Sequence, residues 1–246
     1  MKPGSPLRTE ARVKYDDTPR LDVVGLIETA PRHVLEIGCA AGATGLAVKQ
    51  RFPGCRYTGV ELDPGFCSIA RTRIDRCFQR NIEAEGFDGL GLESDPVDLV
   101  ICADVLEHLY DPWKTLQTLV GLTAEGGQLI ASIPNVQHFS VIQGLVEGEF
   151  RYQPHGLLDA THIRFFTRRG ILELFEGSGW VVQDCVRKMT GAVDWNQLPG
   201  TLTLGRVLIR DATRENAEDL LTFQYLIRSR PRATPAVAVT GTPSGG

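Results

Sequence analysis

The chain has 246 residues, 42% of them hydrophobic and 23% charged, with a formal net charge of -4 at pH 7. This length and composition fit one globular domain, and the mixing of acidic and basic residues disfavours nucleic acid as a partner. No run approaches the roughly 18 to 20 apolar residues of a membrane helix, and the first residues lack the apolar segment of a signal peptide. A cytoplasmic protein without a membrane span is therefore expected.

The two ends differ in composition from the middle of the chain. Residues 1–14 are rich in proline, glycine and charge, and residues 230–246 carry small and turn-forming residues without helical periodicity. Both ends are expected to be mobile, which leaves one domain over residues 15–229. The six cysteines lie singly within apolar stretches and form no Cys-x-x-Cys pair, so we interpret them as buried thiols.

Apolar runs of strand length alternate with helical patterns, which predicts a Rossmann-like α/β fold with a mostly parallel sheet and helices on both faces. The first expected strand, 33–37, leads into a glycine-rich loop and a helix. A second strand, 57–60, ends before Asp63-Pro64, a cap and first-turn pair that begins another helix. The face expected to be buried in that helix carries Phe66, Ile69, Ala70 and Ile74.

Five further strands complete the expected sheet of seven. A short strand is predicted near Cys77-Phe78, and the last strand is expected to be antiparallel after a long connection. Asp111-Pro112 and Thr167 each predict the start of a helix, the first with Trp113, Leu116, Leu119 and Val120 facing inward. The remaining strands are predicted at 97–102, 128–133, 180–186 and 219–227.

Glycines follow the first strand in the pattern G-x-x-x-G-x-x-G, at Gly38, Gly42 and Gly45. This spacing differs from the G-x-G-x-x-G pattern that holds a dinucleotide pyrophosphate at a helix N-terminus. Glycine is needed where a backbone passes against a ligand with no Cβ in the way. Glycines after a strand also serve plain turns, so the loop alone leaves a purely structural interpretation open.

Glu61 adds a second feature at the end of the second strand. A carboxylate at roughly 20 residues beyond such a loop can accept hydrogen bonds from both hydroxyls of a ribose. The alternative is a solvated acid at a helix start, but Asp63 already fills that role. The loop and Glu61 together predict a nucleoside-containing ligand at the carboxyl edge of the sheet.

Four segments, which lie between about Val34 and Trp180, resemble the successive motifs of class I S-adenosylmethionine-dependent methyltransferases in order and spacing: HVLEIGCAAGATG, YTGVELDP, DLVICADVLEHLYDP and GGQLIASIPN. LEH and a THxRFFT-like segment are similar to the small-molecule branch, which includes ubiquinone-pathway O-methyltransferases and methyltransferases of glycan and secondary-metabolite pathways. The resemblance implies S-adenosyl-L-methionine as the cofactor.

The resemblance also implies roles for individual residues. Glu36, Gly38 and Gly42 would line the methionine end of the donor, Glu61 would hold the ribose, and Leu62 would pack on the adenine. Family members often have aspartate where this chain has Asn81, whose amide oxygen can still accept from the adenine amino group. The expected donor site is completed by Cys39, Ala40, Ile82 and Ala103.

Methyl transfer from a sulfonium is an in-line displacement, so much of the catalysis can come from positioning. A base is needed only for a poorly ionised acceptor. Asp104, Glu107 and His108 follow the fourth strand at the edge where a donor would present its methyl group, and their residue types suit acid-base chemistry. His108 could instead be a structural helix histidine.

The expected substrate-side insert, residues 135–167, holds a second group of candidates, among them His138. His162 could take a proton from the acceptor, and Arg164 could pair with an acidic acceptor, beside Asp159. The alternative is that His162 and Asp159 fix the loop by hydrogen bonds while two phenylalanines enter the core. No spacing singles out carboxylates for a metal site with these histidines, so no metal is expected.

The predicted function is methylation of a small-molecule acceptor, with O-methylation of a sugar, a phenol or another metabolite favoured. N- or C-methylation and a non-catalytic donor-binding subunit are the alternatives, because fold and ligand binding do not prove turnover. A nicotinamide-dependent oxidoreductase would share the fold but requires the tighter glycine spacing. The sequence leaves a homodimer open.

Overall fold

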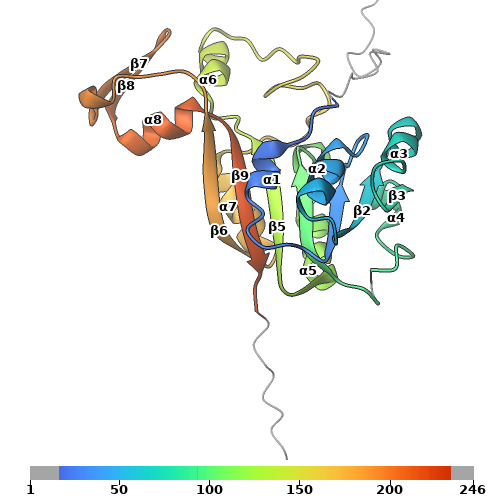
Figure 1. The fold of residues 1–246 in the computed structure, drawn as a ribbon. Helices are drawn as coiled ribbons and strands as arrows, with labels where there is room; N and C mark the ends of the chain where they lie inside the picture. The colour runs from blue at the N-terminus through green and yellow to red at the C-terminus, as the bar shows by residue number, and fades with distance from the viewer. Residues whose placement is uncertain (1–16, 93, 234–246) are drawn as a thin grey trace, which may run out of the picture.

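The predicted strands assemble into one seven-stranded sheet in the order β3-β2-β1-β4-β5-β9-β6 (Figure 1). The computed structural model describes residues 17–92 and 94–233. Strands β1 to β5 run parallel, and β9 pairs antiparallel with both β5 and β6, which confirms the expected Rossmann-like sheet. The strands of this sheet are β1 His33–Ile37, β2 Arg56–Glu61, β3 Arg76–Gln79, β4 Val97–Ala103, β5 Thr123–Pro134, β6 Trp180–Met189 and β9 Thr222–Pro231.

Helices cover both faces of the sheet because successive strand residues point to opposite sides. On one face, Val34 packs with α1, α2 and α3 in an apolar cluster, whereas the neighbouring Leu35 joins the cluster with α5 and α7 on the other face (Figure 1). The helices are α1 Leu21–Gly25, α2 Ala43–Arg51, α3 Pro64–Ala70, α4 Ile82–Glu85, α5 Pro112–Leu122, α6 Phe139–Val146, α7 Arg168–Gly177 and α8 Arg214–Leu221, with 3-10 turns at Leu106–His108 (η2) and Trp195–Gln197 (η3).

The three predicted caps are confirmed. The side chain of Asp63 accepts from the backbone of Gly65 and Phe66, that of Asp111 from Lys114 and that of Thr167 from Gly170. Each cap satisfies donors that the first helical turn leaves without an intrahelical partner. The residue at which each of these three helices begins is therefore determined by the sequence next to it.

Two predicted helix faces are partly wrong. In α3 the buried residues are Cys67 and Ala70, while Ile69 is 43% exposed, because α3 covers only the sheet edge at β2 and β3. In α5, Leu116 and Leu119 are buried as expected, but Trp113 is 40% exposed. Trp113 lies instead under the guanidinium of Arg164, 5.7 Å from it. Periodicity locates a helix face but not how far the neighbouring element covers it.

An addition between β6 and β9 was not predicted. It contains a hairpin of β7 (Gly200–Leu204) and β8 (Val207–Ala212), followed by α8. The stretch from 219 to 221, expected as strand, therefore ends α8, and its Leu220 and Leu221 pack with Leu202 and Leu204 in a small separate core. Figure 1 shows the hairpin and α6 beyond the carboxyl end of the sheet. The addition enlarges the side of the edge where the acceptor is expected.

The structure describes only part of the two ends that were expected to be mobile. Residues 1–14 and most of the expected tail lie outside the described residues. Arg230 and Pro231 pair with Val181 and Trp180, so β9 continues into the start of the expected tail.

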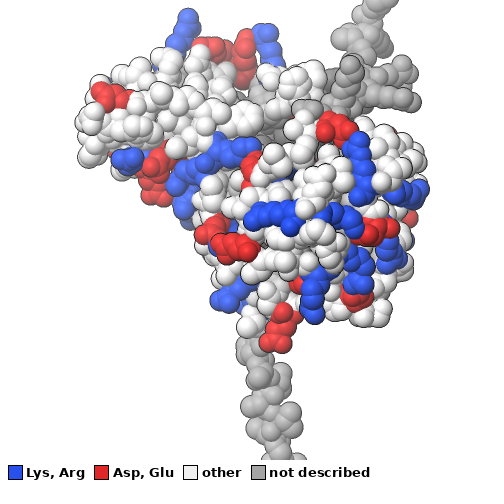
Figure 2. All heavy atoms as spheres, viewed as in Figure 1, with Lys and Arg blue, Asp and Glu red and all other residues white. Residues whose placement is uncertain are grey.

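Within residues 17–92 and 94–233, no helix combines the length and apolar character that a membrane crossing requires. On the face in Figure 2, basic and acidic side chains lie interspersed.

Candidate active site

The glycine loop lies folded against the end of β2. The backbone nitrogens of Gly38 and Cys39 donate to the carbonyl oxygen of Val60, at 2.8 and 3.1 Å. Gly38 and Gly42 have φ angles of 69° and 77°, which glycine adopts without strain. A Cβ atom at Gly38 would come within 2.6 Å of the Val105 side chain. The loop thus requires glycine at both positions and presents bare backbone at the carboxyl edge.

Gly45 has a different role from the first two glycines. A Cβ atom there would lie 2.8 Å from the Tyr57 ring and 2.5 Å from the Ile74 side chain. Gly45 therefore lets α2 pack closely on β2. The motif combines two loop glycines with one packing glycine, which is consistent with a close strand-loop-helix unit.

Glu61 ends β2 beside this loop. Its carboxylate accepts from the backbone nitrogen of Ala40 at 2.8 Å and from that of Asp63 at 2.9 Å. The half-buried side chain is therefore held against the loop. A carboxylate in this place is available to ribose hydroxyls approaching along the loop, whereas the ribose contact itself stays a prediction.

Glu36 lies in the layer between the sheet and α2. It is 3% exposed, and its carboxyl accepts a hydrogen bond of 2.9 Å from the Tyr57 hydroxyl. Burial raises the pKa of Glu36 to about 8, so the carboxyl is mostly protonated at neutral pH. The partner Tyr57 was not identified from the sequence. The contact of Glu36 with the methionine end stays a prediction.

The expected adenine side contains one exposed residue and two with structural roles. Leu62 is 61% exposed, and Ile82 is buried in the core cluster at the start of α4. The amide oxygen of Asn81 accepts from the backbone of Glu83 and Ala84, which makes Asn81 the N-cap of α4. The oxygen expected to receive the adenine amino group thus already has a structural function, consistent with the preference of asparagine for this position.

Asp104 follows β4 with a φ of 56°, and its carboxylate is engaged on several sides. It accepts from the hydroxyl of Ser132 at 3.0 Å and from the side chain of Gln224, and it forms an ion pair with Arg20. Arg20, which sequence reasoning missed, also donates its backbone nitrogen to Thr44 at the start of α2. Asp104 therefore connects the segment before α1 to the carboxyl edge of the sheet. To act as the predicted base, its carboxylate would have to give up contacts with these partners.

Two other expected donor-site residues end or follow the central strands. Ala103 is the last residue of β4 and is half-buried. Cys39 is buried, and its sulfur lies 3.7 Å from that of Cys77, which in turn lies 2.9 Å from that of Cys67. Five of the six cysteines are buried thiols as predicted, while Cys185 is half-buried.

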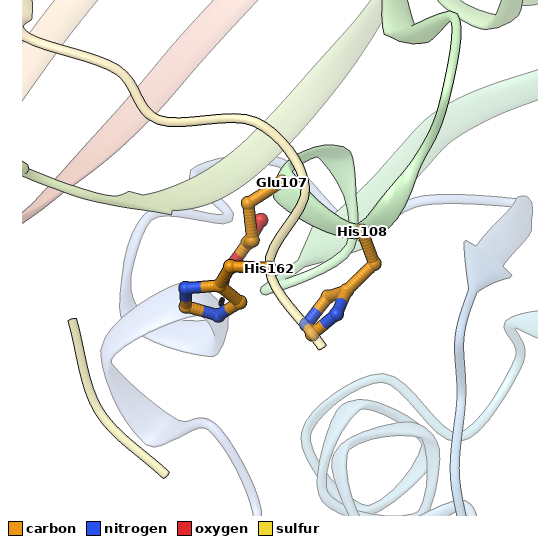
Figure 3. A group of neighbouring side chains, drawn as sticks. All are labelled: Glu107, His108 and His162. Atoms are coloured by element: carbon orange, nitrogen blue, oxygen red, sulfur yellow. Dashed lines mark ion pairs between the residues drawn. The ribbon is translucent and has the colours of Figure 1, made fainter. Parts of the chain in front are cut away.

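The fold brings Glu107, His108 and His162 together (Figure 3). The carbonyl oxygen of Glu107 accepts from the backbone nitrogens of Ile163 and Arg164, both at 3.0 Å, which fastens the insert to η2. The two imidazole rings meet edge to face, with centroids 4.8 Å apart. His162 Nε2 lies 3.9 Å from Glu107 Oε1. One atom from each of the three side chains lies within 4.8 Å of the others, a grouping that sequence spacing did not reveal.

The hydrogen bonds of the two histidines orient their rings. His162 Nδ1 lies 3.2 Å from the Leu157 carbonyl oxygen, and His108 Nδ1 lies 3.2 Å from that of Thr161. Because a carbonyl only accepts, each Nδ1 carries the proton and each Nε2 keeps its lone pair. Burial lowers the pKa of His162 and raises that of Glu107 well above its usual range. Burial therefore disfavours the charged forms of both Glu107 and His162.

The other acceptor-side candidates have partners within the protein. Arg164 donates its Nε to the Tyr110 carbonyl oxygen at 3.1 Å. Asp159 accepts from the backbone nitrogen and the hydroxyl of Thr161, at 2.7 and 2.6 Å, which supports the loop-fixing interpretation. Both ring nitrogens of His138 are engaged, by Ser140 and Thr190. Contacts of these three residues with an acceptor stay predictions.

Known proteins that resemble this chain share the segment that forms the carboxyl edge. Residues 35–129 match a family model described as a methyltransferase domain, a segment that contains the glycine loop, Glu61 and the residues after β4. This segment therefore resembles a methyltransferase domain, and the sheet around it has the fold of class I S-adenosylmethionine-dependent methyltransferases. It is 24% identical over 131 residues to the ubiquinone biosynthesis O-methyltransferase of Coxiella burnetii, covering 52% of this chain and 55% of that protein. It is 25% identical over 138 residues to the malonyl-[acyl-carrier protein] O-methyltransferase of Geobacter sulfurreducens, covering 56% and 51%.

The chain spans only about half the length of these two curated relatives. Solved structures share its fold over more of the chain. A Thermotoga maritima S-adenosylmethionine-dependent methyltransferase, described as a possible histamine N-methyltransferase, gives a TM-score of 0.55 at 18% identity and covers 86% of this chain and 87% of its own. Magnesium protoporphyrin IX methyltransferase of Synechocystis PCC 6803, with bound S-adenosylhomocysteine, gives 0.51 at 13% identity and covers 87% and 78%.

Proposed function

We propose that the protein transfers the methyl group of S-adenosylmethionine to an oxygen atom of a small-molecule acceptor. The observation that carries this proposal is the carboxyl edge itself, where the backbone of Gly38 and Gly42 lies beside the carboxylate of Glu61. Both curated relatives described above are O-methyltransferases, which supports oxygen over nitrogen or carbon as the accepting atom.

The donor would lie along the glycine loop. Its aminoacyl end would pass Gly38 and Gly42, its ribose hydroxyls would donate to Glu61, and its adenine would rest on the exposed Leu62. The methyl group would then point across the edge toward the residues after β4. In this arrangement the backbone supplies shape, and Glu61 supplies charged hydrogen bonds, each of which contributes about 1.5 to 3 kcal/mol.

The acceptor would bind between η2 and the insert. Gly38 lies against Val105, just before η2, so the donor loop and the Glu107, His108 and His162 group belong to one edge. His162 and His108 are the proposed bases for a hydroxyl acceptor, since each Nε2 is free of its proton in the observed hydrogen-bonding pattern. Arg164, His138 and Asp159 would shape the insert around the acceptor.

Transfer of a labelled methyl group tests this function. The full chain is incubated with methyl-tritiated S-adenosylmethionine and a panel of sugars, phenols, quinols, carboxylic acids and amines, and labelled products are separated and identified. Label on oxygen of at least one small molecule is expected. Label only on nitrogen or carbon would contradict the O-methyltransferase assignment, and donor binding with no labelled product from a broad panel would support a non-catalytic subunit.

A further inference from the structure

Three cysteine sulfurs meet beneath the donor loop. Cys39 lies in the loop, Cys67 on α3 and Cys77 on β3. The sulfur of Cys77 accepts a hydrogen bond from the Cys67 thiol at 2.9 Å and lies 3.7 Å from the sulfur of Cys39. None of the three residues is more than 6% exposed. The fold thus gathers thiols from three separate segments into one buried cluster, whose sulfur atoms have no part in the proposed methyl transfer.

The neighbouring strand leaves room for this cluster. Gly59 of β2 pairs with Cys77 in the sheet. A Cβ atom at Gly59 would lie 2.5 Å from the Cys39 sulfur, so a larger residue there would displace that thiol. Glycine within a strand often marks such a close approach. The contact between the sulfurs therefore follows from how the sheet packs.

The three thiols differ in acidity. Hydrogen bonding with Cys39 and Cys67 lowers the pKa of the Cys77 thiol, against the opposing effect of burial, and the nearby positive charge on α3 acts in the same direction. The hydrogen bond to Cys77 raises the pKa of Cys39, whereas burial raises that of Cys67. Because the thiolate is the reactive form of cysteine, Cys77 is the nucleophile of the cluster.

We propose that Cys77 and Cys67 form a reversible disulfide when the chain meets hydrogen peroxide. The Cys77 thiolate attacks one peroxide oxygen, the O–O bond breaks, and the departing hydroxide takes up a proton to become water, which leaves Cys77 as a sulfenic acid. The sulfur of Cys67 then attacks the Cys77 sulfur, the S–O bond breaks, and the hydroxide leaves as water with the proton of Cys67. The two thiols thereby lose two electrons to one peroxide and give one disulfide and two waters.

The distances favour Cys67 over Cys39 as the second partner. A disulfide bond is about 2.05 Å long, so the sulfurs of Cys67 and Cys77 need to approach by roughly 1 Å. Cys39 starts farther away, and its backbone is hydrogen-bonded to Val60 and Gly42. β3 is the edge strand of the sheet, and Cys77 is the most exposed of the three at 6%, which suits entry of a molecule as small as peroxide.

The disulfide would change the donor loop through α3. The backbone of Gly42 packs directly on this helix, since a Cβ atom added to Gly42 would lie 3.1 Å from the Ala70 backbone. Ala70 is about one turn after Cys67, so a shift of Cys67 toward β3 moves the surface on which the loop rests. Oxidation is therefore expected to weaken donor binding. This effect on the donor rests on the proposed function, whereas formation of the disulfide does not.

Thiol mapping of the full chain tests the disulfide. The chain is reduced, freed of reductant, treated with hydrogen peroxide under native conditions, quenched in acid and alkylated after denaturation. Peptide mapping should show Cys67 linked to Cys77 within one chain, and dithiothreitol should reverse the link. Cys77→Ala should leave Cys67 reduced, because the nucleophile is missing. Cys55→Ala, which removes a buried thiol outside the cluster, should leave the link intact.

Calorimetric titration with S-adenosylhomocysteine measures the effect on the donor site. The affinity of the oxidised wild type should fall at least about fivefold, the lower end of the range for coupled sites, and should return on reduction. The affinity of Cys77→Ala should not respond to peroxide, which separates the disulfide from oxidation elsewhere in the chain. Cys55→Ala should respond as the wild type does.

Two results on the wild type would overturn the proposal, and neither depends on a variant that must fold. These are thiols of Cys67 and Cys77 that stay reduced in peroxide, and a disulfide that joins any other pair of cysteines. Unchanged affinity of the oxidised chain would overturn the control of donor binding. Failure of the reduced chain to bind S-adenosylhomocysteine would instead contradict the proposed function, whatever the thiol mapping gives.

Discussion

The donor half and the acceptor half of the carboxyl edge are built in different ways. The donor half is local, because Gly38, Gly42 and Glu61 follow two neighbouring strands and are fixed by backbone contacts within them. The acceptor half is assembled from distant segments, with Glu107 and His108 on η2 and His162 on the insert, next to an added hairpin. Methyltransferases that share one methyl donor but differ in their acceptors would be expected to show this division. Their scaffold can stay constant while the loops that contact the acceptor change.

The largest expected effect falls on the acceptor half alone. His162→Gln removes the imidazole proposed as the base, so kcat should fall at least about 100-fold, within the range usual for acid-base groups. Affinity for S-adenosylhomocysteine should stay within about twofold, since His162 is not part of the glycine loop. Methyl-transfer kinetics and calorimetry check both values, with His155→Gln, at an exposed histidine of the same insert, as the matched control. Equal losses in donor affinity and kcat would contradict a division of the edge.

Gly38→Ala is expected to damage the donor half through the backbone. A side chain at φ 69° costs about 1 to 2 kcal/mol, and its Cβ would meet Val105 at 2.6 Å. Denaturant unfolding should show a loss of about 2 kcal/mol or more, together with weaker donor binding. Adding Val105→Ala should recover the part of the loss that comes from the clash. Gly54→Ala, where a Cβ would meet no described atom within 4 Å, serves as the control.

Glu61→Ala should weaken S-adenosylmethionine binding at least about tenfold, the scale of losing charged hydrogen bonds. At saturating donor, kcat should change little, because the ribose is remote from the reacting methyl group. Calorimetry measures the affinity, and Glu173→Ala, at a side chain 67% exposed on α7, gives the baseline. Donor affinity that matches this baseline would remove Glu61 from the ribose.

A gradual effect, a dependence of stability on pH, is expected in the layer under the donor loop. The pKa of Glu36 rises from 4.5 to about 8 on burial. The folded state thus keeps a proton that the unfolded chain releases, so this contribution is fully present below pH 4.5 and is lost as pH rises toward 8. Glu36→Gln still accepts from Tyr57 but does not titrate. Its stability relative to wild type should increase by about 1 kcal/mol per pH unit between pH 5.5 and 7.5.

Chemical unfolding of both proteins at several pH values measures that difference. Glu173→Gln, which removes an exposed carboxylate, provides the comparison for general charge effects. A stability difference between Glu36→Gln and wild type that does not vary with pH would show that Glu36 titrates normally. Any change of wild-type stability with pH in this range would then have to come from other buried groups.

The same division explains what the sequence could predict. The sheet, the caps at Asp63, Asp111 and Thr167, and the donor loop follow from short-range patterns, and all were predicted. The cap role of Asn81 is also local and could have been found, since asparagine is a favoured N-cap. The clamp of Arg20 on Asp104 joins residues far apart in the chain, and no local signal indicates it.

Two features of the acceptor half could not be predicted from local sequence patterns either. His162 was proposed as a base, but its approach to Glu107 depends on how the insert folds back on η2. The β7 and β8 hairpin was missed because its short strands are separated from the main sheet, and the stretch from 219 to 221 was taken as strand when it ends α8. Apolar residues in such short segments fit either a helix or a strand.

The most direct test of the central claim is calorimetric titration of the full chain with S-adenosylhomocysteine and, separately, with NAD. A loop of bare backbone beside Glu61 should give saturable binding of S-adenosylhomocysteine at one site per chain and no heat of binding with NAD. Binding of NAD without binding of S-adenosylhomocysteine would contradict the assignment of this edge to a methyl donor.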